Sequence, residues 1–97
     1  MGVYLVGYDL KHGSEAEYAD LINAIKKIGS DWWHCLDSTW LIVHPGPPID
    51  ICNALAQHMH RTSVSGGDKL LVGTMAAGAA YTHSFPEDCK TWLNKYL

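Results

Sequence analysis

The chain has 97 residues, which is enough for one small domain, residues 1–97, and too few for two. Hydrophobic residues make up 47% of it, a fraction that excludes intrinsic disorder. The formal net charge is −3, and the seven Lys and Arg residues are scattered. Charge therefore gives no support to tight, salt-sensitive binding of nucleic acid, which is retained only as a candidate partner.

The sequence predicts neither a membrane span nor a signal peptide. No apolar stretch approaches the roughly 20 residues needed to cross a bilayer. The start, Met1 to Asp9, lacks the basic residues of a signal peptide. We therefore expect a cytoplasmic protein without a membrane partner.

The first third of the chain predicts a strand followed by a helix. Val3–Leu10 is rich in β-branched and aromatic residues, and a turn follows at 11–13. Ser14, with Glu17 three residues later, matches a capping box, so the helix begins there and Gly29 ends it. Its apolar residues recur at spacings of three and four and form one stripe: Tyr18, Leu21, Ile22, Ile25 and Ile28.

A hairpin is predicted next. Asp31–Leu36 and Thr39–His44 have the composition of strands, and the short, turn-prone pair between them joins the two. Neighbouring side chains of a strand point to opposite faces. We therefore expect Trp32, His34 and Leu36 to face one layer, and Trp33 and Cys35 to face the other.

The second half of the chain predicts two further helices and a fourth strand. Pro48 is a favourable first residue for a helix, and Lys69–Met75 resembles a strand. A short last helix follows Phe85 and Pro86. The apolar side of the second helix consists of Ile51, Cys52, Leu55 and Met59, and that of the last helix of Cys89, Trp92, Leu93 and Tyr96. This order indicates an α+β fold, a ferredoxin-like βαββαβ sandwich with a short C-terminal helix.

The predicted strands are apolar on both faces, whereas a sheet covered on one side alternates apolar and polar residues. Thr39–His44 contains four consecutive apolar residues, and Lys69–Met75 contains three. Two helices cover only one face of such a sheet, and a large apolar patch on the other is rare in monomers. We therefore expect a homodimer that packs face to face. The alternative is that the C-terminal segment folds back over the open face.

The cysteines and histidines do not predict a metal centre. Cys35, Cys52 and Cys89 form no CxxC pair, and we expect them to be free thiols. His34 and Cys35 are neighbours that point apart on a strand, so zinc ligation is not expected. Cys35 has no identifiable base nearby and is not expected to act as a nucleophile.

Several stretches resemble the SinR-like small proteins, which are relatives of the CRISPR-associated Cas-two family. The stretches are "YLVGYDL", "LINAIKKIGSDWWHCLDSTWLIV", "GDKLLVGTMAAGAA" and "WLNKYL". The hairpin motif points to the SinR-like branch, and the "YD" that ends the first strand matches the Cas-two proteins. The resemblance implies a ferredoxin-like homodimer and a weak metal-dependent endonuclease acting on RNA or DNA phosphodiesters.

The resemblance also implies a site. The aspartate that ends the first strand, here Asp9, would bind Mg²⁺ near the dimer twofold axis, because two facing carboxylates repel unless a hard cation lies between them. His12, three residues later, is the candidate general base. The alternatives are a solvated carboxylate at Asp9 and a merely exposed His12. The alternative function is a non-catalytic dimer that binds protein or nucleic acid in a defence or toxin–antitoxin system.

Overall fold

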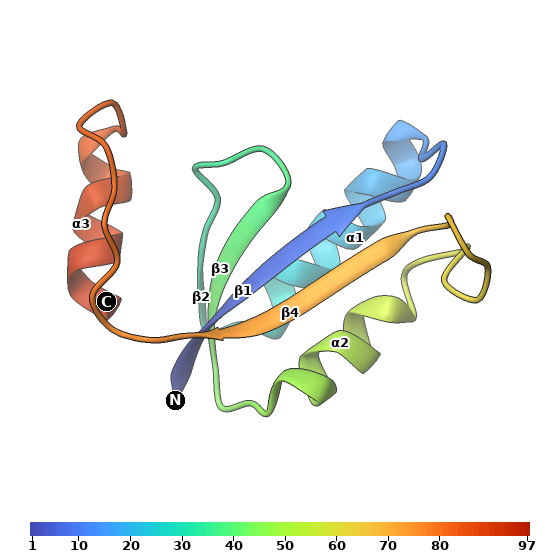
Figure 1. Ribbon diagram of the computed structural model, residues 1–97, viewed down its shortest axis with the longest axis horizontal. Coiled ribbons are helices and arrows are strands. Elements are labelled where there is room, and N and C mark those ends of the chain that lie inside the picture. The colour runs from blue at the N-terminus through green and yellow to red at the C-terminus, as the bar shows by residue number, and fades with distance from the viewer.

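The computed structural model describes all residues, 1–97, and has four strands and three helices. In chain order these are β1 (Gly2–Asp9), α1 (Glu15–Ile28), β2 (Asp31–Trp33), β3 (Thr39–His44), α2 (Pro48–Ala56), β4 (Lys69–Met75) and α3 (Glu87–Tyr96). The predicted α+β class is confirmed (Figure 1). None of the helices combines the length and the apolarity that a membrane crossing requires.

The four strands form one antiparallel sheet in the order β2-β3-β1-β4. The hairpin partners β2 and β3 are adjacent, while each of the other two connections carries a helix and skips one strand. Residue Leu5 of β1 lies between Leu41 of β3 and Gly73 of β4, which fixes the register at the centre of the sheet. The outer strands are β2 and β4, and β4 is the longer of these two edges.

The helices α1 and α2 cover one face of the sheet (Figure 1). The amide of Glu17 donates to Ser14 Oγ at 3.2 Å, so the predicted N-terminal cap of α1 is confirmed. Burial of an apolar stripe holds both helices, because each buried aliphatic side chain contributes roughly 1.5–3 kcal/mol. The core on this side comprises Tyr4, Val6, Tyr8, Leu10, Leu21, Ile25, Trp40, Ile42, Ile51, Leu55 and Met59.

The second face of the sheet is partly covered by α3, which stands apart from α1 and α2 and is reached by the long segment after β4 (Figure 1). A smaller core forms there from Val3, Trp33, Leu41, Val43, Cys89 and Leu93. The alternative, that the C-terminal segment folds back over the open face, is thus confirmed for part of that face. Toward the far ends of β1 and β4, the exposed Asp9, Lys69 and Leu71 lie beyond this cover.

Two expectations about the hairpin and the cysteines were wrong. The second strand ends at Trp33 and not at Leu36, and Cys35 forms a disulfide with Cys89 instead of remaining a free thiol. These differences have one cause, because the bond to α3 draws Cys35 away from the ladder that β2 makes with β3. The sulfurs belong to residues 54 positions apart, a pairing that spacing does not reveal. Only Cys52 is free.

Candidate functional site

The candidate site lies on the second face of the sheet, which α3 covers only in part. Strand β1 alternates, so Tyr4, Val6 and Tyr8 enter the core under α1 and α2, and the intervening side chains point the other way. By register, Gly7 pairs with Leu71 and Asp9 with Lys69 on this second face. We call Gly7, Asp9, Lys69, Leu71 and Gly73 the open patch.

The open patch is apolar and shallow at its centre. Leu71 is 68% exposed, the second most exposed of the large hydrophobic side chains after Met1. Its neighbours Gly7 and Gly73 have no side chains, and a Cβ added at Gly73 would meet no atom within 4 Å. An exposed leucine flanked by bare backbone is a surface that a flat partner can approach closely.

A groove of about 350 Å³ lies between the sheet and the C-terminal segment, and no residue of the open patch lines it. Leu5, Leu41 and Met75 of the sheet line one side of it, and Tyr81 and Phe85 line the other. Hydrophobic residues make up 11 of its 13 lining residues, so it lacks the convergent polar groups that orient a small substrate. Its composition suits apolar packing and not catalysis.

The structure places the predicted catalytic residues at the rim of the open patch. Asp9 ends β1, is exposed and is paired in register with Lys69. His12 lies in the following turn, is exposed and has φ 54° in the left-handed region. No group of three or more His, Cys, Asp or Glu side chains gathers anywhere in the chain to hold a metal ion. Asp9 as a magnesium ligand therefore stays a prediction, and we derive no chemical step through Mg²⁺ from one chain.

A buried aspartate that the sequence did not single out positions this turn. The side chain of Asp68 is 1% exposed, and its oxygens accept from the backbone NH groups of Lys11 (2.8 Å), His60 (3.3 Å) and Arg61 (3.3 Å). The guanidinium of Arg61 also donates to Asp68 and to Glu17 of α1. These bonds tie the turn after Asp9 to the segment before β4 and to the start of α1.

The charges of this network are mutually stabilised. Burial raises the pKa of Asp68, but the three backbone NH groups and the Arg61 charge outweigh burial, so its pKa lies below the ordinary value. The hydrogen bond from Arg61 lowers the pKa of Glu17. Gly67 is required beside Asp68, because a Cβ there would collide with the carbonyl oxygen of Arg61. The adjacent Gly66-Gly67 pair is the only sequence signal of this loop, and it does not reveal the role of Asp68.

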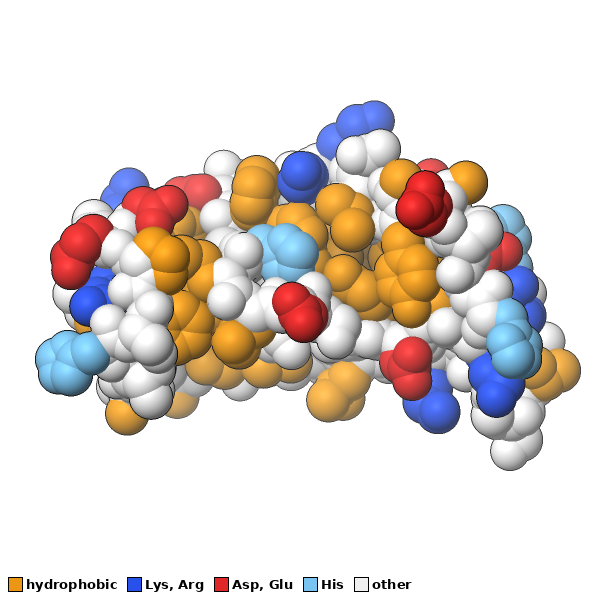
Figure 2. Space-filling model, turned by 90° about the horizontal axis from the view of Figure 1, so that it is seen from above, with side chains coloured by type: hydrophobic (Ala, Val, Ile, Leu, Met, Phe, Trp, Pro, Cys, Tyr) orange, Lys and Arg blue, Asp and Glu red, His pale blue; other side chains and the backbone are white.

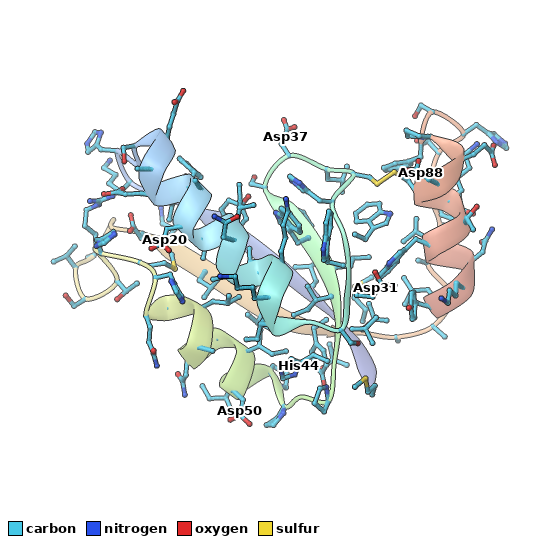
Figure 3. All side chains as sticks on the ribbon, turned by 180° about the vertical axis from the view of Figure 1, so that it is seen from behind. Asp20, Asp31, Asp37, His44, Asp50 and Asp88 are labelled. Carbon is cyan, nitrogen blue, oxygen red and sulfur yellow. A yellow bond between two sulfur atoms is a disulfide. The ribbon has the colours of Figure 1, made fainter.

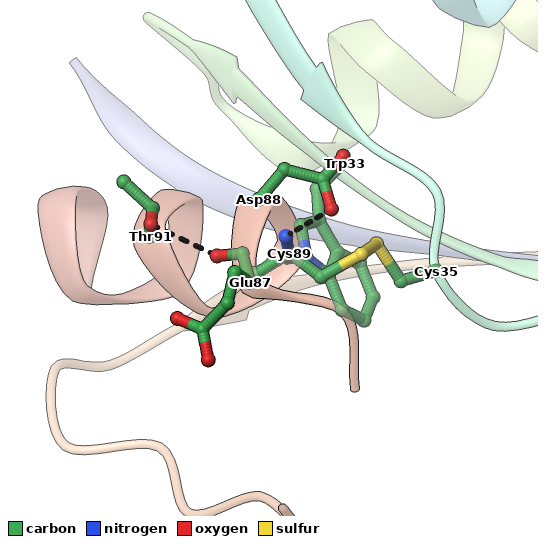
Figure 4. Close-up of a disulfide and its surroundings, with 6 residues drawn as sticks. All are labelled: Trp33, Cys35, Glu87, Asp88, Cys89 and Thr91. Atoms are coloured by element: carbon green, nitrogen blue, oxygen red, sulfur yellow. Dashed lines mark hydrogen bonds between the residues drawn. A yellow bond between two sulfur atoms is a disulfide. The ribbon is translucent and has the colours of Figure 1, made fainter. Parts of the chain in front are cut away.

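Three alternate residues of the β2 segment hold α3. Asp31 accepts from the Tyr96 hydroxyl at 2.7 Å, Trp33 Nε1 donates to the Cys89 carbonyl at 3.2 Å, and Cys35 is bonded to Cys89. Figure 4 shows the indole of Trp33 beside the disulfide, and Figure 3 shows Asp31 between the strand and α3. Trp33 and Cys35 therefore share one face, as predicted, and α3 is the element that covers it.

The side chains of the other parity, Trp32 and His34, face α1 and the core that lies under α1 and α2. The ring of His34 stacks on Trp40 with centroids 3.8 Å apart, and Trp32 packs against Trp40 beneath Lys26 Nζ. The prediction is wrong for Leu36, which lines the groove together with Trp33 because the chain has left the strand by then.

The tryptophans of the hairpin are mostly buried. Trp40 is fully buried and Trp33 is 5% exposed, so only Trp32 among the hairpin tryptophans presents a free edge. On the face drawn in Figure 2, acidic, basic and hydrophobic side chains are interspersed, without a stripe of Lys and Arg. Stacking of bases on a tryptophan platform has no support from this arrangement.

Comparison with known proteins adds no relative. No family model matches the chain, and neither the curated proteins nor the solved structures give a match. The resemblance to the SinR-like and Cas-two proteins therefore stays an expectation, and the residues themselves carry the functional argument.

Proposed function

We propose that the protein is a homodimeric module of ferredoxin-like architecture whose two copies pack through the open patch. The sheet order β2-β3-β1-β4 with all neighbours antiparallel supports the ferredoxin-like part. It is the order expected when two βαβ units interlock so that each crossover skips one strand.

The observation that carries the dimer is the exposed Leu71 between two glycines. Burial of this side chain against a second copy would remove apolar area from water, and each Å² removed contributes roughly 25 cal/mol. A twofold interface uses the same patch on both copies and so must be self-complementary. Asp9 and Lys69 are adjacent and opposite in charge. Near a twofold axis, Asp9 of each copy can therefore approach Lys69 of the other copy.

The experiment compares two substitutions of exposed aliphatic residues. Leu71→Asp places a charge at the centre of the proposed interface, whereas Ile49→Asp places one on α2, where Ile49 is 59% exposed and away from the second face. We expect the first variant to sediment as a monomer and the second as a dimer. A Leu71→Asp variant that remains a dimer with wild-type affinity would refute the open patch as the interface.

A second candidate function is metal-dependent phosphodiester hydrolysis at paired Asp9 residues. The specific observation in its favour is that Asp9 belongs to the open patch, so the proposed twofold interface would bring two carboxylates together although one chain has only one. Mg²⁺ bound there would polarise a phosphate and activate a water. His12, in the same turn region, is the candidate base.

This second function is tested with purified wild type, Asp9→Asn and His12→Ala on single-stranded RNA and double-stranded DNA, each with Mg²⁺ or Mn²⁺. We expect Asp9→Asn to abolish cleavage and His12→Ala to lower its rate, with the dimer intact in both. Equal cleavage by wild type and Asp9→Asn would mean a contaminating nuclease. That result would leave the non-catalytic dimer, a binding module of a defence or toxin–antitoxin system, as the function.

A further inference from the structure

We propose that the Cys35–Cys89 disulfide is a redox clasp: it holds α3 over the second face of the sheet and so sets how much of that face a second copy can reach. The inference rests on the proposed function, because the second copy is the partner named there. It adds a covalent control that neither the fold nor the dimer by itself requires.

The attachment of α3 depends heavily on this bond. A helix of 10 residues is marginal on its own, and residues 76–86, which join it to β4, contain no helix or strand. Only two residues of α3 are buried, Cys89 and Leu93, and one of them is the disulfide residue itself. The other attachments are the Trp33–Cys89 and Tyr96–Asp31 hydrogen bonds and one from the Gly78 amide to the Leu97 carbonyl. Partly buried side chains also pack against the smaller core: Trp92, Tyr96 and Leu97.

The size of the effect follows from chain entropy. The segment from the end of β4 to Cys89 is a loop of about 15 residues, and a disulfide that closes a loop of this length favours the closed arrangement by about 100-fold. Reduction is therefore expected to raise the fraction of chains with α3 undocked by about that factor, while the first core, on the other face of the sheet, stays folded.

A reductant can reach the bond. A pocket of about 240 Å³ opens beside the disulfide and is lined by Trp32, His34, Pro86, Asp88 and Trp92 together with both cysteines. Figure 4 shows the disulfide bridging the first turn of α3 to the segment after β2. Cys35 is half-buried whereas Cys89 is 7% exposed, so Cys35 is the more exposed residue of the pair.

The redox step balances with a dithiol protein as reductant. One thiolate of the dithiol attacks the Cys35 sulfur and forms a mixed disulfide, and Cys89 leaves as a thiolate that takes up a proton. The second thiolate of the dithiol then displaces Cys35, which is protonated in turn. Two electrons and two protons pass to the chain, and the reductant ends as a disulfide. In a cytoplasmic protein, a disulfide of this kind is expected to be redox-active and not permanent.

Undocking of α3 would enlarge the surface offered to a partner copy. Val3, Trp33, Leu41 and Val43 lie under α3 and are continuous through Leu5 with the open patch. A second copy that already packs on the open patch would gain these side chains. We therefore expect the reduced chain to dimerise more tightly than the oxidised chain.

The test uses the full-length chain, oxidised or treated with dithiothreitol, and measures amide hydrogen exchange of residues 90–97 together with the dimer dissociation constant. We expect reduction to speed exchange in α3 about 100-fold, to leave the central strands protected and to tighten the dimer. The double variant Cys35→Ser, Cys89→Ser should behave like the reduced chain without reductant. Cys52→Ser, which removes only the free thiol, should still respond to reductant as the wild type does.

Two results would overturn the clasp. The first is unchanged exchange in α3 after reduction. The second, equal dimerisation of oxidised and reduced chains, removes this inference and leaves the proposed dimer standing. A monomer under both conditions removes the proposed dimer itself, and the exchange data then still report whether the disulfide holds α3.

Discussion

The hydroxyl of Tyr96, in the last turn of α3, donates a hydrogen bond to Oδ2 of Asp31, the first residue of β2, at 2.7 Å. The disulfide fixes the opposite end of the same helix, at Cys89. The helix is thus held at both ends by the segment from Asp31 to Cys35, which consists of β2 and the two residues that follow it. The core between these two points is small, with Leu93 as its one buried side chain from α3 besides Cys89.

Removal of this hydroxyl should loosen the end of α3. We expect Tyr96→Phe to lower the free energy of unfolding by about 1 kcal/mol, toward the low end for hydrogen bonds to a charged group because the pair is partly exposed. Urea denaturation of wild type, Tyr96→Phe, Asp31→Asn and the double variant measures the coupling. If the two single changes add fully in the double variant, the hydrogen bond contributes nothing.

Acidification should weaken the fold through three carboxylates. The hydrogen bond from Tyr96 lowers the pKa of Asp31, and Glu17 and Asp68 also have lowered pKa values. A lowered pKa means that the unfolded chain binds protons first, so the stabilisation is complete above the unfolded-state values and is lost as the pH falls through the folded-state values. We expect the thermal midpoint to fall steadily below about pH 4. A midpoint that stays constant from pH 5 to pH 2 would contradict this assignment.

Replacement of Asp68 should have a larger effect than replacement of an exposed carboxylate. Asp68→Ala leaves the NH groups of Lys11, His60 and Arg61 without their acceptor, and we expect the thermal midpoint to fall by several degrees. Asp50→Ala on the exposed side of α2 is the matched control and should change the midpoint little. Equal effects of the two substitutions would show that the Asp68 network does not stabilise the turn that carries Asp9 and His12.

Addition of a side chain at Gly73 should weaken dimerisation without lowering the stability of the single chain. A Cβ there meets no atom within 4 Å, and valine suits a strand better than glycine, so Gly73→Val should leave the stability of the isolated chain unchanged or raised. The same side chain would stand between two copies packed through the open patch. We expect weaker dimerisation of this variant by analytical ultracentrifugation. Wild-type dimerisation combined with wild-type stability would argue against close packing at Gly73.

The helices and the central strands could be predicted because their signals are local. The apolar stripe of α1 and its Ser14 cap are encoded within one continuous stretch, the 14 residues of the helix and the residue before them, and β3 and β4 begin and end where composition places them. The apolar strands also predicted that both faces of the sheet need cover. Periodicity does not reveal which segment covers the second face, and in the structure α3 covers part of it.

The missed features depend on residues far apart in the chain. The disulfide joins positions 54 apart, and its pull on Cys35 shortens β2, which composition alone extended to Leu36. Asp68 accepts a hydrogen bond from the amide of Lys11, which lies 57 residues earlier in the chain, and nothing in either local stretch signals the pairing. Asp9 was proposed from a resemblance, and it belongs to no group of three or more His, Cys, Asp or Glu side chains in one chain.

The most direct test of the account is the mass of the wild-type chain in solution. Light scattering coupled to size exclusion at tens of micromolar should give twice the 10.7 kDa of one chain, and Leu71→Asp under the same conditions should give the mass of one. A wild-type mass of a single chain, both before and after reduction of the disulfide, would contradict packing through the open patch.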